Sequence, residues 1–351
     1  MTEPSMAYQV VIGVDTHDLI HVAVGVDHLG RRLGHISIAT SAAGYEEFLA
    51  WAFALGEVSA VAMEGTGSYG HALCAMLQSR GVRVVEVARP SRRNRRNRGK
   101  ADLMDAEAAA RAFLGGEVTA EPRGSDASVA MIRTLRVARE AFVNQRTQTI
   151  NQLRALVVMA QPALREALAG LSAPRLVDRV ARLRVAGVAT PSDASRFAMR
   201  QLARHVRDID AQVEELDAEI IPIVTRRAPE LLAVHGVGID VAGNVLVAWD
   251  SPRRIRSEAA FAALCGVAPV PASSGKTNRH RLSRGGDRTA NRALWRIVLT
   301  RLRTDERTRE YLARRQAEGK SKREVIRCLK RYVAREIYHV LQRLGPGAPA
   351  A

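Results

Sequence analysis

The sequence predicts an α/β domain with a mixed sheet at its N-terminal end, followed by segments that are mostly helical. Short apolar runs separated by turn residues recur from residue 9 to residue 87, which is typical of strands. Beyond residue 121 the strand signals stop, and apolar residues recur at helical spacing. A length of 351 residues with 47% hydrophobic content is sufficient for two or three domains with real cores.

The charge balance predicts a polyanionic partner. The formal net charge is +17, and the only lysines are Lys100, Lys276, Lys320, Lys322 and Lys330, so the rest of the positive charge is arginine. Arginine makes forked contacts to phosphate and to guanine, which favours nucleic-acid recognition. A coding bias toward arginine is the simpler alternative for part of this excess.

The cysteines and the apolar runs predict a cytoplasmic protein. Cys74, Cys265 and Cys328 lie far apart and match neither a zinc pattern nor a disulfide framework. Residues 1–8 are too short and too polar for a signal peptide, and no apolar run reaches membrane-spanning length. We therefore expect a reducing compartment and no membrane partner.

The N-terminal elements follow one another with short links. The first three strands predict an antiparallel meander, and the later helices act as crossovers that make the last strands parallel to their neighbours. The expected elements are strands 9–14, 21–26 and 33–38, a helix capped by Ser41, strand 58–63, helix 69–80, strand 82–87 and a helix that begins near Asp102.

Four acids are placed for metal binding. Asp15 and Glu64 each follow the carboxyl end of an apolar strand, where ligands of such sheets collect. Asp102 and Asp105 are three residues apart and share one face of a helix. Four converging carboxylates are the ligand set that two divalent cations prefer. Taken singly, Asp15 is also a common turn residue, and the helical pair also suits a helix N-terminus, where each acid contributes up to about 1 kcal/mol.

A basic run between the last predicted strand and the acidic helix is a candidate for binding a nucleic-acid backbone. Crowded like charges beside a metal site favour a bound anion, and each neutralised phosphate steepens the salt dependence of binding. A solvated loop is the alternative. The cations of the run are Arg92, Arg93, Arg95, Arg96, Arg98 and Lys100.

The middle of the chain predicts long helices, one over 126–160 and another that begins at Ser192. Apolar residues in the second helix recur in alternating steps of four and three, which is a coiled-coil seam. The seam pairs either within the chain or with another subunit, and the sequence leaves both open. Its members are Leu202, Val206, Ile209, Val213, Leu216, Ile220 and Ile223.

The last segment carries a turn, a loop and two more helices. Gly236-Val-Gly238 between apolar stretches has the spelling of a helix-hairpin-helix, whose backbone N–H groups bind phosphate; a plain tight turn is the alternative. The neighbouring His235 is expected to be structural. Ser257 caps a short helix that ends near Leu264, and an irregular basic loop follows. Asp287 then caps one helix, and a final helix covers 321–344.

These motifs resemble those of a known family. Gly13-Val-Asp15-Thr, Met63-Glu64-Gly-Thr-Gly-Ser-Tyr69 and Lys100-Ala-Asp102-Leu-Met-Asp105-Ala resemble the DEDD transposases of bacterial insertion sequences, of the insertion-sequence family one-ten. The order of strands and acids also resembles the RNase H-like fold of the junction resolvase RuvC. Phe261-Ala-Ala-Leu-Cys-Gly266-Val-Ala-Pro269, then Ser274-Gly275 and Ser283-Arg-Gly-Gly-Asp-Arg288, are similar to the C-terminal domain of the same transposases. His235 stands where their hairpin usually has proline.

The resemblance implies a domain plan and a chemistry. It implies a RuvC-like DEDD domain over 8–120, a helical coiled-coil assembly region over 121–228, and a transposase domain with helix-hairpin-helix over 229–345. The nucleophilic serine maps to Ser274, with Ser273 as the fallback, and attack leaves a phosphoserine link to DNA. The acids would hold Mg²⁺, as two ions, with Mn²⁺ as an alternative. The implied phosphate-binding cations are Lys276, Arg279, Arg281 and Arg284.

The same resemblance implies partners. These are donor and target DNA, a structured bridge RNA that guides the enzyme, and further copies of this chain in a dimer or tetramer associated with the bacterial nucleoid. Two other function classes remain as alternatives. One is a RuvC-like junction endonuclease in which metal-activated water cuts the strand, and the other is a non-catalytic nucleic-acid scaffold whose acids are structural.

Overall fold

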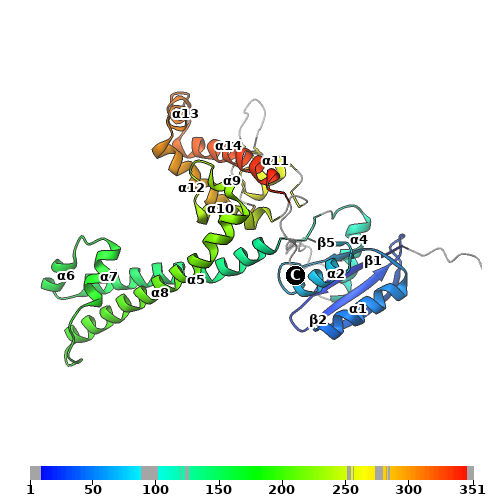
Figure 1. Ribbon diagram of the computed structural model, residues 1–351, viewed down its shortest axis with the longest axis horizontal. Coiled ribbons are helices and arrows are strands. Elements are labelled where there is room, and N and C mark those ends of the chain that lie inside the picture. Colours follow the sequence, from blue (N-terminus) through cyan, green and yellow to red (C-terminus); the bar gives the residue numbers. More distant parts are fainter. Residues whose placement is uncertain are drawn as a thin grey trace, which may run out of the picture. The chain divides into compact units, whose positions relative to one another are not determined.

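The computed structural model describes residues 9–87, 102–118, 120–122, 126–250, 254–255, 257–272, 280–281, 283 and 285–345. The chain divides into two compact units (Figure 1). The N-terminal unit comprises residues 1–127 with 249–261 and 345–351, and the helical unit comprises 128–248 with 262–344. Within the described part of the chain, no helix is long and apolar enough to cross a membrane.

The N-terminal unit contains a five-stranded mixed sheet in the order β3-β2-β1-β4-β5. The β1–β2 and β2–β3 pairs are antiparallel, and the β1–β4 and β4–β5 pairs are parallel. The predicted mixed sheet and its order of elements are therefore confirmed. The bounds are β1 Gln9–Thr16, β2 Ile20–Val26, β3 Arg32–Ala39, α1 Ala42–Leu55, β4 Glu57–Met63, α2 His71–Ser79, β5 Val84–Glu86 and α4 Asp102–Leu114.

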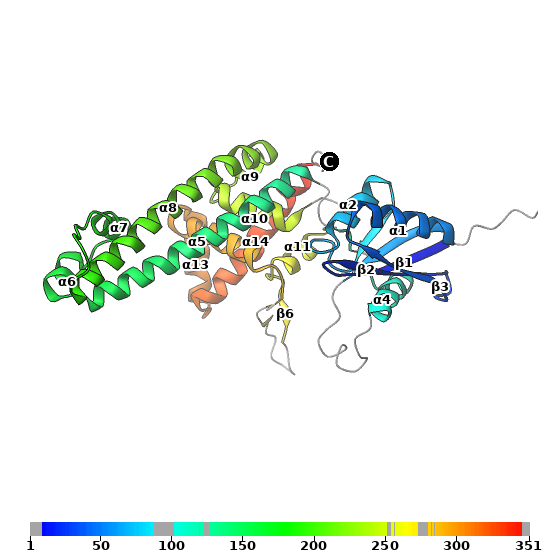
Figure 2. The ribbon, with the colours of Figure 1, turned by 90° about the horizontal axis from the view of Figure 1, so that it is seen from below.

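Helices cover both faces of this sheet (Figure 2). On one face, Val10, Ile12 and Val14 of β1 belong to a core shared with α1 and α2. On the other face, Val11 of β1 packs with Ala106 and Ala110 of α4. Alternate side chains of β1 thus serve different cores, as strand geometry requires. The Ser41 cap of α1 is also confirmed, because its side chain accepts a hydrogen bond from the Gly44 N–H.

Helix α4 lies unusually close to β1. A Cβ atom on Gly13 would stand 1.8 Å from the carbonyl oxygen of Ala106 and 2.7 Å from the backbone nitrogen of Ala110. Backbone atoms of a packed helix have little room to move, so only glycine fits at this position. The alanines of α4 complete the close fit, since larger side chains would push the helix away from the strand.

The helical unit is built on an antiparallel hairpin of α5 (Ala127–Met159) and α8 (Pro191–Arg227), which run side by side in both views (Figures 1 and 2). Arg139 pairs with Asp217, while Arg146, further along α5, pairs with Asp210, earlier in α8. The short helices α6 (Pro162–Leu168) and α7 (Ala173–Ala181) close its tip around a shared apolar core. The long helices therefore pair within the chain, while pairing with a second copy stays a prediction.

The start of α8 corrects one expectation. The helix begins at Pro191 and not at Ser192, because Thr190 is the N-cap. The Thr190 side chain accepts from the Asp193 N–H, and the Asp193 carboxylate accepts from the Thr190 N–H. This reciprocal capping box, with proline in the first turn, stabilises the start of the helix.

The rest of the helical unit packs α12 and α14 together with shorter elements. The predicted Asp287 cap is confirmed, since its side chain accepts from the Thr289 and Ala290 N–H groups. Ser321 also caps α14, because its side chain accepts from the Glu324 N–H. The His235 Nε2 atom lies 2.8 Å from the Thr304 hydroxyl, and the His235 carbonyl oxygen accepts from Arg301 Nε, which agrees with a structural role. The bounds are α9 Pro229–Leu232, α10 Ile239–Trp249, α11 Glu258–Leu264, β6 Val270–Pro271, β7 His280–Arg281, α12 Arg288–Thr304, α13 Glu306–Ala317 and α14 Lys322–Arg343.

The Gly13 contact predicts a cost for any side chain at that position. Gly13→Ala should lower the free energy of unfolding by about 2 kcal/mol or more, the scale of overpacking a core. Gly34→Ala in β3 is the matched control, because its Cβ would meet only side-chain atoms of Leu55 and Trp51 at 3.7 Å or beyond. Denaturant unfolding of the two full-length variants compares them. Equal stability of both would show that α4 does not depend on Gly13.

Candidate functional site

The sheet brings Asp15 and Glu64 to the same edge. In β1, Val11 and Gly13 face α4, and Asp15 is the next residue in that alternation. In β4, Ala62 faces α4, so the alternation places Glu64 toward the same side. The two strand ends are joined directly, because the Glu64 N–H donates to the Val14 carbonyl oxygen at 3.4 Å and the Thr16 hydroxyl donates to the Glu64 carbonyl oxygen at 3.0 Å. The two predicted strand-end acids therefore come from adjacent parallel strands.

Helix α4 brings the second pair of acids. Asp102 and Asp105 lie in its first turn. Each stands four residues before an alanine that packs on the sheet, Ala106 or Ala109, so the acids lie on the sheet-facing side of the helix. The close packing of α4 on β1 thus carries both acids toward the end of β1.

His17 is a site residue that the sequence analysis missed. Its Nε2 atom lies 3.1 Å from Asp15 Oδ2 and 3.5 Å from Asp102 Oδ1, and its side chain is 40% exposed. The side chain therefore joins the strand acid to the helix acid. The available signal was its spacing, because His17 follows Asp15 by two residues and so continues the same face of the strand.

Electrostatics show that the acids crowd one another. Burial raises the pKa of Asp15 above its usual value of 3.8, the neighbouring His17 opposes this, and the negative charges of Asp102 and Asp105 raise it further. A carboxyl group that resists ionisation beside other carboxylates gains most from a bound cation. The arrangement therefore fits a divalent metal, which would relieve both the burial and the repulsion.

The ligand geometry agrees in part with the predicted set. One atom each from Asp15, His17 and Asp102 lies within 4.8 Å of the others, close enough to surround one ion. Among the described residues, Glu64 and Asp105 stand outside this compact group. Oxygen donors suit Mg²⁺ or Mn²⁺, and His17 adds a nitrogen that contacts both of the carboxylates a cation would bind.

The predicted nucleophile and most of the predicted basic residues lie outside the described residues. These are Ser273 and Ser274, the run Arg92, Arg93, Arg95, Arg96, Arg98 and Lys100, and the later cations Lys276, Arg279 and Arg284. The chain around the serines is described on both sides. Strands β6 and β7 pair through Val270 with Arg281 and Pro271 with His280, and the serines fall between these strands in the sequence.

The Gly236 turn is described. Gly236 has φ +86° and packs against Ile297 of α12, whereas a Cβ on Gly238 would meet nothing within 4 Å. The helix before the turn, α9, has only four residues. At the start of α10, Asp240 pairs with Arg136 at 2.9 Å and also contacts Arg296. Since a carboxylate already stands in this first turn, phosphate binding by Gly236 and Gly238 stays a prediction.

The raised pKa of Asp15 predicts a trade between stability and metal binding. A raised folded-state pKa stabilises the folded chain below pH 4, and this contribution is lost as the pH rises through the folded value. At pH 7 and without metal, Asp15→Asn should therefore raise the melting temperature. Added Mn²⁺ or Mg²⁺ should stabilise the wild type and leave Asp15→Asn unaffected.

Asp18→Asn is the matched control for this experiment. Asp18 is exposed and lies three residues after Asp15, and the substitution removes the same charge. It should melt like the wild type in both conditions. If added metal raises the melting temperature of Asp15→Asn, the proposed site is contradicted. It is also contradicted if Asp18→Asn lacks the rise that metal causes in the wild type.

Comparisons with known proteins agree with these motifs. A family model described as a transposase matches residues 12–162, and a model of the IS116/IS110/IS902 transposase family matches residues 228–313. The chain is 30% identical over 135 residues to the insertion element IS900 uncharacterized 42 kDa protein of Mycobacterium paratuberculosis, which is 37% of this chain and 34% of that protein.

A second relative is the insertion element IS110 uncharacterized 43.6 kDa protein of Streptomyces coelicolor, 28% identical over 123 residues, or 34% of this chain and 30% of that protein. The matched regions thus span about a third of the length of these two relatives. The first family model contains the candidate acids, and the second contains the segment around both serines. This chain belongs to the IS110 family of transposases.

Proposed function

We propose that this chain is a transposase that cuts and rejoins DNA through a covalent phosphoserine intermediate at a metal-dependent acidic site. The observation that carries the proposal is the meeting of Asp15 and Asp102 around His17, at the edge of the sheet where Glu64 also arrives. An acidic cluster of this kind in a chain of net charge +17 fits phosphate chemistry on a polyanion.

The fold of the N-terminal unit supports this reading. Its strand order β3-β2-β1-β4-β5, with one antiparallel meander and two parallel pairs, agrees with an RNase H-like, RuvC-like domain. In this interpretation Asp15, Glu64, Asp102 and Asp105 hold Mg²⁺, as two ions, or Mn²⁺. The bound metal would supply positive charge to the attacking and leaving oxygens of the phosphate. His17 positions the Asp15 and Asp102 carboxylates through its two contacts.

The proposed nucleophile is Ser274, with Ser273 as the alternative. The serine oxygen forms a bond to phosphorus while one bridging P–O bond of the DNA strand breaks. The serine proton passes to a nearby base, and the departing strand oxygen takes up a proton to become a free hydroxyl end. The energy of the broken bond is kept in the serine ester, so the strand can be rejoined when a strand end attacks the ester. The serine hydroxyl needs a base to take its proton, because a neutral hydroxyl is a weak nucleophile at neutral pH.

The basic residues hold the substrate in this proposal. The run Arg92, Arg93, Arg95, Arg96, Arg98 and Lys100 contacts the nucleic-acid backbone beside the acids, and Gly236 with Gly238 offers backbone N–H groups to phosphate. Lys276, Arg279, Arg281 and Arg284 position phosphates near the serine. Guidance by a structured bridge RNA, assembly as a dimer or tetramer through the long helices, and action at the bacterial nucleoid rest on the family resemblance alone.

A junction endonuclease is a second candidate, because the same strand order and acids suit an enzyme in which water attacks the phosphate. The two functions differ in one product. Serine attack leaves protein attached to DNA, whereas water attack leaves free strand ends.

The serine prediction is tested on denaturing gels with element-end DNA and Mg²⁺. Wild type and Ser273→Ala should form a protein–DNA adduct, while Ser274→Ala should form none and lose strand cleavage. Asp102→Asn should also form none, because the metal site is incomplete. Cleavage by Ser274→Ala without an adduct would favour the junction endonuclease, and unchanged recombination by Asp102→Asn would favour a scaffold.

A further inference from the structure

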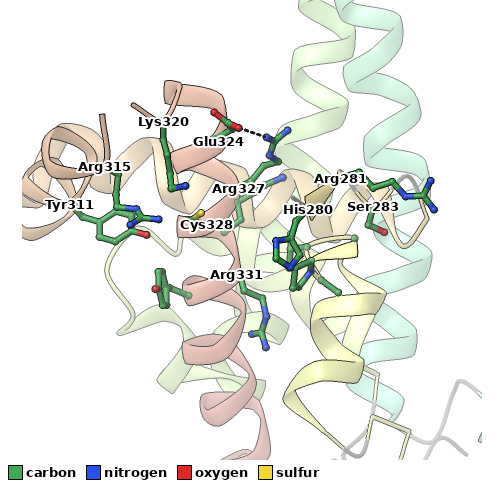
Figure 3. A pocket seen from close by; sticks show the side chains of 16 residues that line it. His280, Arg281, Ser283, Tyr311, Arg315, Lys320, Glu324, Arg327, Cys328 and Arg331 are labelled. Atoms are coloured by element: carbon green, nitrogen blue, oxygen red, sulfur yellow. Dashed lines mark ion pairs between the residues drawn. The ribbon is translucent and has the colours of Figure 1, made fainter. Parts of the chain in front are cut away.

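The helical unit contains a cavity of about 820 Å³ that is lined by α13, α14, residues 266–269, and His280, Arg281 and Ser283 (Figure 3). Arg327 and Arg331 reach it from α14, Tyr311 comes from α13, and Arg281 comes from β7. None of these residues belongs to the acidic site. The cavity is therefore a second candidate binding site, distinct from the acidic one.

The charge of the lining selects an anion. Among the described residues that line the cavity, six are arginine or lysine, and Glu324 is the one carboxylate. Glu324 lies 3.7 Å from Arg327, and Arg315 pairs with Glu318, so part of the charge is balanced locally. The described lining as a whole carries six cationic side chains and one carboxylate, and this excess of positive charge favours a phosphate-bearing ligand.

The walls also offer aromatic rings. Tyr311 and Tyr332 meet edge to face with 5.8 Å between ring centroids, and the guanidinium of Arg315 lies over the Tyr311 ring at 6.0 Å. The Tyr332 side is open, since that residue is 55% exposed. Burial raises the pKa of Tyr311 to about 12. An exposed ring beside several cations is a combination that binds unpaired bases.

Hydrogen bonds link the cavity residue Lys330 to the backbone that precedes the serines in the sequence. Lys330 is buried, with 7% exposure, and its Nζ donates to Asn291 Oδ1 at 2.8 Å. The Asn291 amide donates in turn to the carbonyl oxygens of Cys265 and Gly266, at 2.7 and 3.3 Å. These hydrogen bonds join α14, α12 and the turn before β6 into one rigid wall, against which a ligand would lie.

Size limits the occupant. The volume lies within the range of about 300–1,000 Å³ that is typical of small-ligand pockets, which suits one nucleotide and excludes a duplex. Arg281 pairs with Val270 across β6 and β7, the two strands between which Ser273 and Ser274 fall in the sequence. On the proposed function, this nucleotide would then belong to the strand on which the serine acts. We propose that the cavity holds one unpaired nucleotide of the DNA strand near the serine, with its base on Tyr332 and its phosphate on Arg281, Arg327 and Arg331. This inference rests on the proposed function.

The stacking half of the proposal is tested by fluorescence anisotropy of the full-length protein with a labelled single-stranded DNA of about 12 nucleotides. Tyr332→Ala should bind this strand roughly 10-fold more weakly, the scale of one lost base stack, with an unchanged salt slope. Binding of the matching duplex should not change. Tyr332→Trp keeps a ring and should bind like the wild type, which separates stacking from folding.

The phosphate half is tested on one helix. Arg327→Ala should weaken single-strand binding and reduce the salt slope by about 0.7, as one lost phosphate contact predicts. Arg323→Ala is the matched control, because it removes the same charge four residues earlier on α14, outside the cavity lining. Equal losses in both variants would overturn the proposal in favour of diffuse charge attraction.

Two further results would overturn the assignment. One is wild-type affinity of Tyr332→Ala for single-stranded DNA. The other is a loss confined to an RNA strand of the same sequence, which would make the occupant RNA. Phe197→Ala, which removes another exposed ring paired with an arginine, should bind like the wild type.

The adduct assay separates this inference from the proposed function. If wild type forms the serine adduct but Tyr332→Ala binds single strands normally, the cavity assignment fails and the function stands. If wild type forms no adduct while Tyr332→Ala still loses single-strand binding, the function fails and the cavity remains a nucleotide site.

Discussion

The contact between α4 and β1 at Gly13 is the constraint on which the candidate site depends. Because Gly13 has no side chain, the backbone of Ala106 and Ala110 can lie directly on the strand. Asp102 then stands one turn earlier in the same helix and reaches Asp15, the next inward residue of the strand, through His17. A wider separation of helix and strand would leave each acid solvated and alone, with no group able to bind a metal.

The acidic cluster opposes the stability that this packing supplies. Burial and neighbouring carboxylates make ionised Asp15 unfavourable, so the core formed by β1, β4 and α4 must hold the charges together. Such strain is expected where a site is built for a cation that relieves it. The helical unit carries charge of the opposite sign, since arginine and lysine side chains line its cavity around two tyrosines. One unit therefore gathers carboxylates, and the other gathers guanidinium groups around a cavity.

Much of the N-terminal unit could be predicted because strand periodicity, turn residues and strand-end acids are local signals. The order of elements and the first-turn position of Asp102 and Asp105 followed from them. The two-residue spacing of His17 from Asp15 is a weak signal by itself, so only the contacts of His17 with Asp15 and Asp102 identified it as a site residue. Helix α13 was missed because its surface is almost wholly polar, with Thr308 as its buried residue. The seam of α8 predicts a partner helix but not which one, and the structure supplies α5.

Anomalous scattering from crystals soaked in Mn²⁺ is the decisive test of whether the packing of α4 on β1 builds a metal site. We expect an anomalous peak within about 2.0–2.3 Å of carboxylate oxygens of both Asp15 and Asp102, with Glu64 or Asp105 in the same coordination shell. Bound Mn²⁺ elsewhere in the chain, with no peak between Asp15 and Asp102, would contradict it.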